Sequence, residues 1–153
     1  MSQIASLLPT ANILLDLDAG SKARLFDAVG ALFEANLGLA KKVVVDSLRA
    51  REKLGSTGLG QGIAIPHGRI RGLAEAQGAF ARLKSPIPFD APDGKPVAQV
   101  FVLLVPEHAT EQHLQLLSEL AQMFSEARFR DSLGDVTDAD ELRAVFDRWE
   151  PAA

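Results

Sequence analysis

The chain alternates between segments in which apolar residues recur every three or four positions and short segments that are apolar throughout. The first periodic segment begins after Ser21, a typical helix N-cap, and ends at Gly38, a typical helix stop. Its apolar positions are Leu25, Phe26, Val29, Leu32, Phe33 and Leu37. A second amphipathic helix is predicted over roughly residues 40–53, with Val44, Val45 and Leu48 on its buried side.

Two uninterrupted apolar runs predict buried strands. The run Ile63–Ile65 stops at Pro66, so His67 is expected just past the carboxyl end of a short strand. Residues 97–105 predict a central strand that is buried on both faces. A further strand, rich in alanine, is predicted over residues 76–84.

Three more helices are predicted in the C-terminal third of the chain. Thr110 is expected to cap the first, a short helix near 126–132 is expected to end at Gly134, and Thr137 and Asp140 mark the start of the last. The inward faces of the first and last are expected to carry Leu117, Leu120 and Phe124, and Leu142, Val145, Phe146 and Trp149, respectively.

Helices mixed with a few buried strands predict an α/β fold with an at least partly parallel sheet. Residues 1–20 form an apolar lead-in whose structure the pattern leaves open, and residues 85–96, with four prolines, are expected to be a loop. The chain of 153 residues, 47% of them hydrophobic, is long enough to bury one sizeable core and contains no internal repeat. A single domain is therefore predicted.

Charge and cysteine content narrow the function classes. The formal net charge of −4 has the opposite sign from a nucleic-acid-binding surface, so no nucleic-acid partner is expected. The sequence has no cysteine, which excludes disulfides, thiolate metal sites and cysteine nucleophiles. Asp16 and Asp18 interrupt the N-terminal apolar run, so neither a secretory signal nor membrane insertion is expected and a cytoplasmic location follows by default.

Histidine is the side chain that titrates near neutrality, and two of the three histidines occupy informative positions. His67 follows the strand 63–65, and His113 lies in the first turn of the helix that follows the strand 97–105. If these strands are parallel, the two imidazoles can face each other across one crevice at the edge where α/β sheets bind ligands. The alternative for His113 is a partly buried histidine with an ordinary structural role. His108 is expected to be exposed.

The glycine-rich stretch 56–62 precedes His67 and can present backbone N–H groups and two hydroxyls to an anion of phosphate size. The residues assigned to such a phosphoryl-binding loop are Ser56, Thr57, Gly58, Gly60 and Gly62. An ordinary tight turn is the alternative. Neither a Walker A motif nor a dinucleotide-binding fingerprint fits, because the stretch leads into a strand and not a helix.

Arg51 closes the second helix just before this loop. It could belong to a solvated basic face, but beside a neutral imidazole an arginine is the expected stabiliser of a phosphoryl group carried on nitrogen. An unprotonated ring nitrogen of His67 could then attack phosphorus in line, with no metal or separate base required when the donor is itself a phosphoamidate.

The segment from Arg51 to Gly68 reads REKLGSTGLGQGIAIPHG. It closely resembles the active-site segment of the fructose/mannitol-type enzyme IIA proteins of the bacterial phosphotransferase system. The similarity continues at Gln112-His113-Leu114 and extends over roughly residues 5–148. The sequence Leu54-Gly55-Ser56-Thr57-Gly58 looks most like the nitrogen-regulatory branch of that family.

This resemblance implies a mixed, about five-stranded sheet flanked by helices over a domain at 5–148, with tails at 1–4 and 149–153. It implies that His67 accepts a phosphoryl group on Nε2 from the phosphohistidine of an HPr-like carrier, that His113 is the second active-site histidine and that Arg51 stabilises the charged state. Nitrogen-branch members resemble signalling proteins whose phosphorylation state regulates partners such as potassium transporters and sensor kinases. No cofactor or metal is implied.

Three alternative functions are weighed against this one. The chain could be a sugar-specific IIA component that passes phosphate to a separate IIB protein. It could be a metal-dependent hydrolase that uses His67, His113 and a carboxylate such as Glu107 or Glu111, although no metal-binding motif of known spacing is present. It could also be a module that binds an anionic metabolite without a covalent step.

Overall fold

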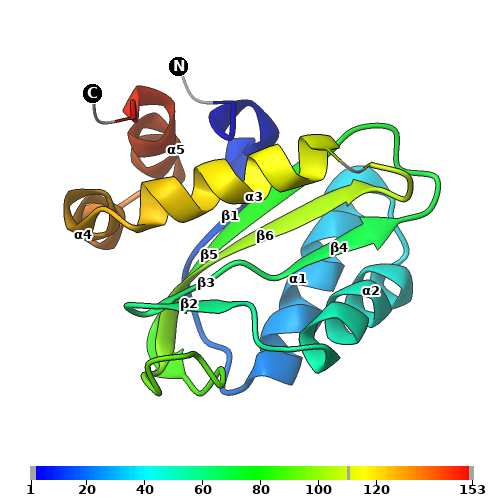
Figure 1. Cartoon of the computed structure of the whole chain (residues 1–153), viewed down its shortest axis with the longest axis horizontal. Helices are drawn as coiled ribbons and strands as arrows, with labels where there is room; N and C mark the ends of the chain where they lie inside the picture. Colours follow the sequence, from blue (N-terminus) through cyan, green and yellow to red (C-terminus); the bar gives the residue numbers. More distant parts are fainter. Residues whose placement is uncertain (1–2, 110, 152–153) are drawn as a thin grey trace.

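The computed structural model describes residues 3–109 and 111–151, which form one mixed sheet with helices on both faces (Figure 1). The helices α1 and α2 cover one face, and α3, α4, α5 and the N-terminal 3-10 turn η1 cover the other. The helices are α1 (Lys22–Leu37), α2 (Lys41–Lys53), α3 (Glu111–Phe124), α4 (Ala127–Asp135) and α5 (Ala139–Arg148), with the 3-10 turns η1 (Ala5–Leu7) and η2 (Thr10–Asn12). Within these described ranges, no helix is both long and apolar enough to cross a membrane.

The sheet runs in the order β1-β5-β6-β3-β2, and β4 pairs with β6 on the same side as β3. Its strands are β1 (Ile13–Leu17), β2 (Gly58–Gly60), β3 (Ile63–Ala64), β4 (His67–Ile70), β5 (Gln77–Ile87) and β6 (Val97–Pro106). β1 is parallel to β5, and β3 and β4 are parallel to β6, whereas β5 is antiparallel to β6 and β2 to β3. The predicted α/β class with a mixed sheet is confirmed, and β3 and β4 together occupy one of five positions across it.

β6 is the central strand, and its apolar run explains why. Every residue from Val100 to Val105 is buried, with alternate side chains entering the two layers, as expected for a strand covered on both faces. Phe101, Leu103 and Val105 belong to the core under α3 and α5, while Val100, Val102 and Leu104 belong to the core under α1 and α2. The sheet is therefore packed on both faces, and this packing holds in place the sheet edge at which His67 lies.

The predicted helices are present, with small differences at their ends. Ser21 caps α1 by accepting a hydrogen bond from the Arg24 amide at 3.2 Å, and Gly38 ends it in the left-handed conformation with φ 71°. α5 is capped by Asp138 and not by the neighbouring Thr137, because the Asp138 carboxylate accepts from the Glu141 amide at 2.8 Å. The predicted N-cap Thr110 lies outside the described residues.

Two predicted segments change extent. β5 continues to Ile87, so the expected loop at 85–96 begins three residues late. The N-terminal segment, whose structure the sequence pattern left open, contributes β1 to the sheet edge beside β5. On α3, Leu120 and Phe124 are buried as predicted, while Leu117 is only partly buried. At the ends of the expected domain, Ile4 is fully buried and the Trp149 indole donates to Glu126 at 3.1 Å.

The prediction that His67 follows the end of a strand is wrong in one respect. Ile63–Ala64 pairs with Gln99 and Val100, and His67 then opens β4 by pairing with Leu103 in the same parallel register. The strand is therefore broken at Ile65 and Pro66 and resumes at His67. Pro66 has no N–H to donate, which explains the gap in the ladder.

Candidate active site

The His67 ring is held by a different partner at each nitrogen. Nδ1 lies 2.9 Å from the Ile65 carbonyl oxygen, and Nε2 accepts a hydrogen bond from Arg51 Nε at 3.2 Å. A carbonyl can only accept and a guanidinium can only donate, so these partners assign the proton to Nδ1 and the lone pair to Nε2. The local fold thus presents a neutral imidazole with its nucleophilic nitrogen facing Arg51.

Burial lowers the pKa of His67 below its usual value of 6.5, and the positive charge of Arg51 acts in the same direction. The hydrogen bond to Ile65 and the negative charge of Glu52 oppose this shift. The net lowering keeps the ring unprotonated at neutral pH. An unprotonated ring retains the lone pair that a nucleophile needs.

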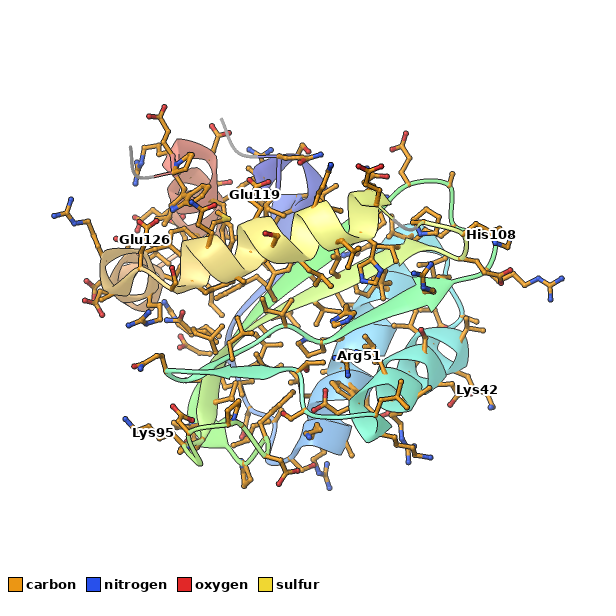
Figure 2. All side chains as sticks on the ribbon, viewed as in Figure 1. Lys42, Arg51, Lys95, His108, Glu119 and Glu126 are labelled. Carbon is orange, nitrogen blue, oxygen red and sulfur yellow. The ribbon has the colours of Figure 1, made fainter. Side chains whose placement is uncertain are left out.

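Arg51 lies at the last turn of α2, and its guanidinium is fixed at two points. Besides the contact with His67, its Nη1 donates to the Gly55 carbonyl at 2.8 Å. Figure 2 shows Arg51 between α2 and the strands and not on the outer basic face. This position is the one expected from the sequence for a group that stabilises charge at His67.

His113, in the first turn of α3, lies against His67. The two ring centroids are 5.3 Å apart, with the ring planes inclined by 66°. Burial lowers the pKa of His113, and the charges of His67, Arg69 and Arg51 lower it further. Its Nε2 is buried without a hydrogen-bond partner, an arrangement that costs free energy unless a ligand or water completes it.

A cavity of about 310 Å³ opens beside His67 between the loop after α2 and the outer face of α3. Its lining residues are Arg51, Ser56, Thr57, Gly58, Leu59, Ile65, His67, Leu117, Ser118 and Ala121. The cavity thus lies at the predicted sheet edge, but of the two histidines only His67 lines it. Three residues of the predicted anion-binding loop, Ser56, Thr57 and Gly58, form part of its wall.

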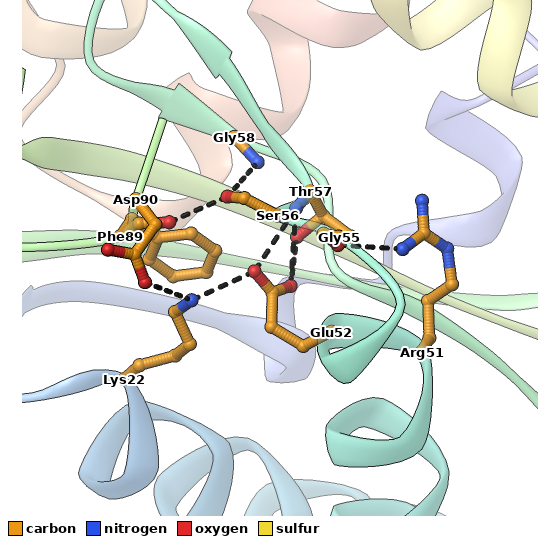
Figure 3. A network of polar contacts seen from close by, with 9 residues as sticks. All are labelled: Lys22, Arg51, Glu52, Gly55, Ser56, Thr57, Gly58, Phe89 and Asp90. Carbon is orange, nitrogen blue, oxygen red and sulfur yellow. Dashed lines mark hydrogen bonds and ion pairs between the residues drawn. The ribbon is translucent and has the colours of Figure 1, made fainter. Parts of the chain in front are cut away.

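The donors of these loop residues are already paired with protein groups (Figure 3). The Thr57 amide and hydroxyl both donate to the Glu52 carboxylate, the hydroxyl at 2.6 Å. Ser56 donates to the Phe89 carbonyl at 2.6 Å and accepts from the Gly58 amide at 3.0 Å. The loop is thus a braced wall, and it does not present the row of free N–H groups that the glycine pattern suggested.

Gly60 and Gly62 do not line the cavity. Both have positive φ, 89° and 79°, and they shape the turn between β2 and β3. The Gly62 carbonyl accepts from the Ala98 and Gln99 amides at 2.9 and 3.1 Å. These glycines are explained by the hairpin that carries the chain into β3.

The remaining candidates lie away from the crevice. His108 is 94% exposed and pairs with Glu107 at 3.3 Å, so its predicted exposure is confirmed (Figure 2). Over residues 3–109 and 111–151, no three His, Cys, Asp or Glu side chains are grouped so that they could hold a metal ion. The Glu107 or Glu111 ligand set considered for a hydrolase is therefore not assembled there.

Sequence reasoning missed Glu52 and Lys22. Glu52 is 6% exposed in its side chain and forms a 2.9 Å ion pair with Lys22, which comes from the first turn of α1. Glu52 could have been suspected because it directly follows Arg51, but nothing in the sequence pairs it with a lysine 30 residues earlier. Only the packing of α1 against α2 brings the two together.

The fold, with its paired histidines and arginine at one sheet edge, has known counterparts. Residues 6–149 match the family described as "Phosphoenolpyruvate-dependent sugar phosphotransferase system, EIIA 2". The chain belongs to this family of phosphotransferase-system IIA components, which confirms the resemblance noted in the sequence.

Similar proteins within the family carry the name nitrogen regulatory protein. The one from Pseudomonas aeruginosa is 42% identical over 146 residues, 95% of each chain, and the one from Escherichia coli K12 is 39% identical over 127 residues, 82% of this chain and 78% of that protein. The crystal structure of nitrogen regulatory protein IIA-Ntr from Neisseria meningitidis superposes with a TM-score of 0.90 at 54% identity, covering 95% of this chain and 99% of that one. The IIA mannitol structure from E. coli shares the fold, with a TM-score of 0.74 at 20% identity over 90% of this chain and 97% of that one.

Proposed function

We propose that the protein is a phosphohistidine carrier of the nitrogen phosphotransferase system, in which His67 receives a phosphoryl group on Nε2. The observation that carries this proposal is the pairing of the His67 ring: Nδ1 is occupied by the Ile65 carbonyl, and Nε2 keeps its lone pair beside a guanidinium. A neutral imidazole fixed in this tautomer can act as a nucleophile without a separate base.

In the proposed transfer, the Nε2 lone pair forms a new P–N bond while the P–N bond of the donor phosphohistidine breaks. The electron pair of the broken bond returns to the donor ring nitrogen. The Nδ1 proton of His67 stays in its hydrogen bond with Ile65, so that carbonyl stabilises the positive charge that develops on the ring. The step needs no metal, because one P–N bond forms as another P–N bond breaks.

Arg51 must release Nε2 before phosphorus can reach it. Its Nε–H currently fills the position of the incoming phosphoryl group, and the side chain can turn this donor toward an equatorial phosphoryl oxygen while Nη1 stays on Gly55. His113 is assigned the second contact, because its ring lies against that of His67 and its buried Nε2 has no partner. The residues Ser56, Thr57 and Gly58 are assigned to shaping the wall that holds these groups.

An HPr-like carrier of the nitrogen branch is the proposed donor. Two of the exposed large apolar side chains support a protein partner here: Leu54 lies at the end of α2, three residues after Arg51, and Leu59 lines the cavity. Apolar groups grouped around a polar site are typical of a surface that a protein covers.

The proposed output is regulation, with potassium transporters or sensor kinases as candidate targets. Phosphorylation adds about −1.5 to −2 charges at the crevice, which moves the formal charge of the chain from −4 toward about −6. A target that covers neutral His67 would then meet a charge that it must desolvate. The relatives named nitrogen regulatory protein support this role over that of a sugar-specific IIA component.

Incubation with a phosphorylated HPr-type carrier tests the proposal. We expect an acid-labile, base-stable label that maps to His67 and is absent from His67→Ala. His67→Gln distinguishes a carrier from an anion-binding module, because a binding module keeps affinity for phosphate while a carrier loses all transfer. Failure of the parent protein to take up label, or stoichiometric zinc without label, contradicts the proposal.

A further inference from the structure

Glu52 lies at the end of α2, on the side of the loop opposite to the cavity that His67 faces. Its carboxylate receives three donors: Lys22 Nζ at 2.9 Å, the Thr57 hydroxyl at 2.6 Å and the Thr57 amide at 3.1 Å (Figure 3). A buried carboxylate with this number of donors is a fixed anchor and not a solvated surface group. Lys22 also contacts the Phe89 ring, with Nζ 4.5 Å from the centroid, and so is itself held in place.

A continuous set of hydrogen bonds leads from this anchor to the His67 ring. Glu52 holds Thr57, the Thr57 carbonyl accepts from the Ile65 amide at 3.0 Å, and the Ile65 carbonyl accepts from His67 Nδ1 at 2.9 Å. Displacement of Thr57 would therefore move the carbonyl that sets the tautomer of His67.

The same anchor acts on the other ring nitrogen through Arg51. The Gly55 carbonyl that accepts from Arg51 lies two residues before Thr57, so the loop that Glu52 braces also supplies the fixed partner of the guanidinium. Both partners of the His67 ring thus depend on the position of residues 55–57. Glu52 touches neither His67 nor the cavity, so apart from the effect of its charge on the pKa of His67 its influence acts through this loop.

We propose that Glu52, neutralised by Lys22, is a positioning residue for His67: it braces residues 55–57 and thereby holds Ile65 and Arg51 on the two ring nitrogens. The inference rests on the proposed function for its kinetic consequence. Its structural consequence, the tautomer of His67, is independent of any donor.

The test compares variants that remove the brace with variants that keep it. Glu52→Ala and the isosteric Thr57→Val remove it, Thr57→Ser retains the hydroxyl donor, and Asp46→Asn is the matched control. Asp46 also lies on α2 and pairs with a lysine, Lys42, at 2.8 Å, but this pair is exposed and remote from the loop. Glu52→Gln keeps the side-chain shape and one acceptor oxygen, and it remains informative if Glu52→Ala fails to fold.

Single-turnover transfer is measured from a phosphorylated HPr-type carrier and from the small donor phosphoramidate, which needs no docking surface. We expect Glu52→Ala and Thr57→Val to slow transfer from both donors by roughly ten- to a hundredfold. Glu52→Gln and Thr57→Ser should slow both transfers by less, and Asp46→Asn should stay within about twofold of the parent. Slowing from the carrier alone would overturn the proposal in favour of a docking role, and parent-like rates in Glu52→Ala would also overturn it.

Nitrogen NMR of the His67 ring provides the second readout. The parent should show protonation at Nδ1, whereas Glu52→Ala and Thr57→Val should show a mixture of both tautomers, with amide signals elsewhere unchanged. A parent-like tautomer in both variants overturns the proposal. If the parent takes phosphate from neither donor, the proposed function fails, and the tautomer still decides whether Glu52 positions the ring. If the parent accepts phosphate and all variants match it, only the role of Glu52 fails.

Discussion

The two walls of the His67 crevice satisfy their polar groups in opposite ways. On the α2 side, Arg51, Glu52 and Thr57 are all tied into hydrogen bonds within the loop. On the α3 side, His113 presents a buried Nε2 with no partner. The polar groups of the α2 wall are thus paired within the protein, whereas the His113 nitrogen beside His67 has no partner among the described residues.

This difference separates two requirements of group transfer. A reacting nitrogen must be held in one orientation before the donor arrives. This requires surrounding polar groups that already have hydrogen-bond partners and move little. A developing charge must also meet a donor that is not already engaged, which calls for an unsatisfied group at the right place. In the proposed transfer, the end of α2 would meet the first requirement and His113, in the first turn of α3, the second.

The largest effect on function short of removing His67 is expected at Arg51. Arg51→Ala removes both the partner of Nε2 and the charge that would meet the phosphoryl oxygens, so the transfer rate should fall by roughly 10²- to 10³-fold. Thermal melting by circular dichroism should remain cooperative near the parent midpoint, because the guanidinium is not part of either core. A loss of helix in Arg51→Ala would mean that the α2 wall needs this residue for folding.

A smaller effect on function is expected on the opposite wall. His113→Ala should slow transfer by about ten- to a hundredfold, less than loss of His67, because the α2 wall still orients the nucleophile. It should leave stability nearly unchanged or slightly raised, since it removes a buried nitrogen without a partner. Stopped-flow transfer and denaturant titration check these outcomes, and an unchanged rate would remove His113 from the site.

The tight fit of the α2 wall can be tested at Gly68, next to His67. A Cβ at this position would clash with Ser47 Oγ and lie 3.2 Å from Ser47 Cβ, so the Ser47 side chain would have to turn away from the Arg69 carbonyl to which it donates. Gly68→Ala should lower the free energy of unfolding by about 1–3 kcal/mol in denaturant titrations. Gly20→Ala is the control, because a Cβ there meets nothing within 4 Å. Equal stability of the two variants would show that the wall is looser than its contacts indicate.

The smallest effect is the pH dependence of stability, to which both walls contribute a histidine. The pKa values of His67 and His113 lie below the reference value of 6.5 in the folded protein, so the unfolded chain binds more protons between these values. The contribution of the two rings to stability is therefore full above 6.5 and falls as the pH drops through the folded pKa values. Unfolding free energies measured at a series of pH values should fall less steeply in the double variant His67→Gln/His113→Gln.

The transfer reaction should follow the same titration at His67. Its rate should be level from pH 8 down to about 6.5 and should fall in more acidic solution, because a protonated ring has no lone pair at Nε2. A fall that begins above the reference pKa would show that burial does not lower the pKa of His67.

Local patterns predicted the elements well because their causes are local. The periodic apolar positions of α1, its Ser21 cap and its Gly38 stop depend on neighbours within a few residues. The two histidines could also be placed, since parallel strands bring their carboxyl ends to one edge. The burial of β6 on both faces followed from its continuous apolar run.

Pairings between distant segments could not be predicted in the same way. The stretch 56–62 has the composition of an anion-binding loop, but its donors are consumed by Glu52, Phe89 and Asp93. Those partners lie on α2 or about 30 residues downstream, and only the folded chain brings the downstream ones to the loop. Composition therefore indicated that backbone conformation matters there, while tertiary contacts decided what the loop does.

The backbone pairing just before His67 has a consequence for the chemistry of the ring. The Ile65 amide donates to the Thr57 carbonyl, so the Ile65 peptide group faces the β2 side of the sheet and not β6, and in a complete antiparallel pair its carbonyl would accept in return from the Thr57 amide. The Thr57 amide donates to Glu52 instead, so the Ile65 oxygen stays outside the ladder and accepts from the His67 ring. With the Ile65 carbonyl engaged in the sheet, the His67 ring would lack this acceptor, and the backbone would no longer fix the proton on Nδ1.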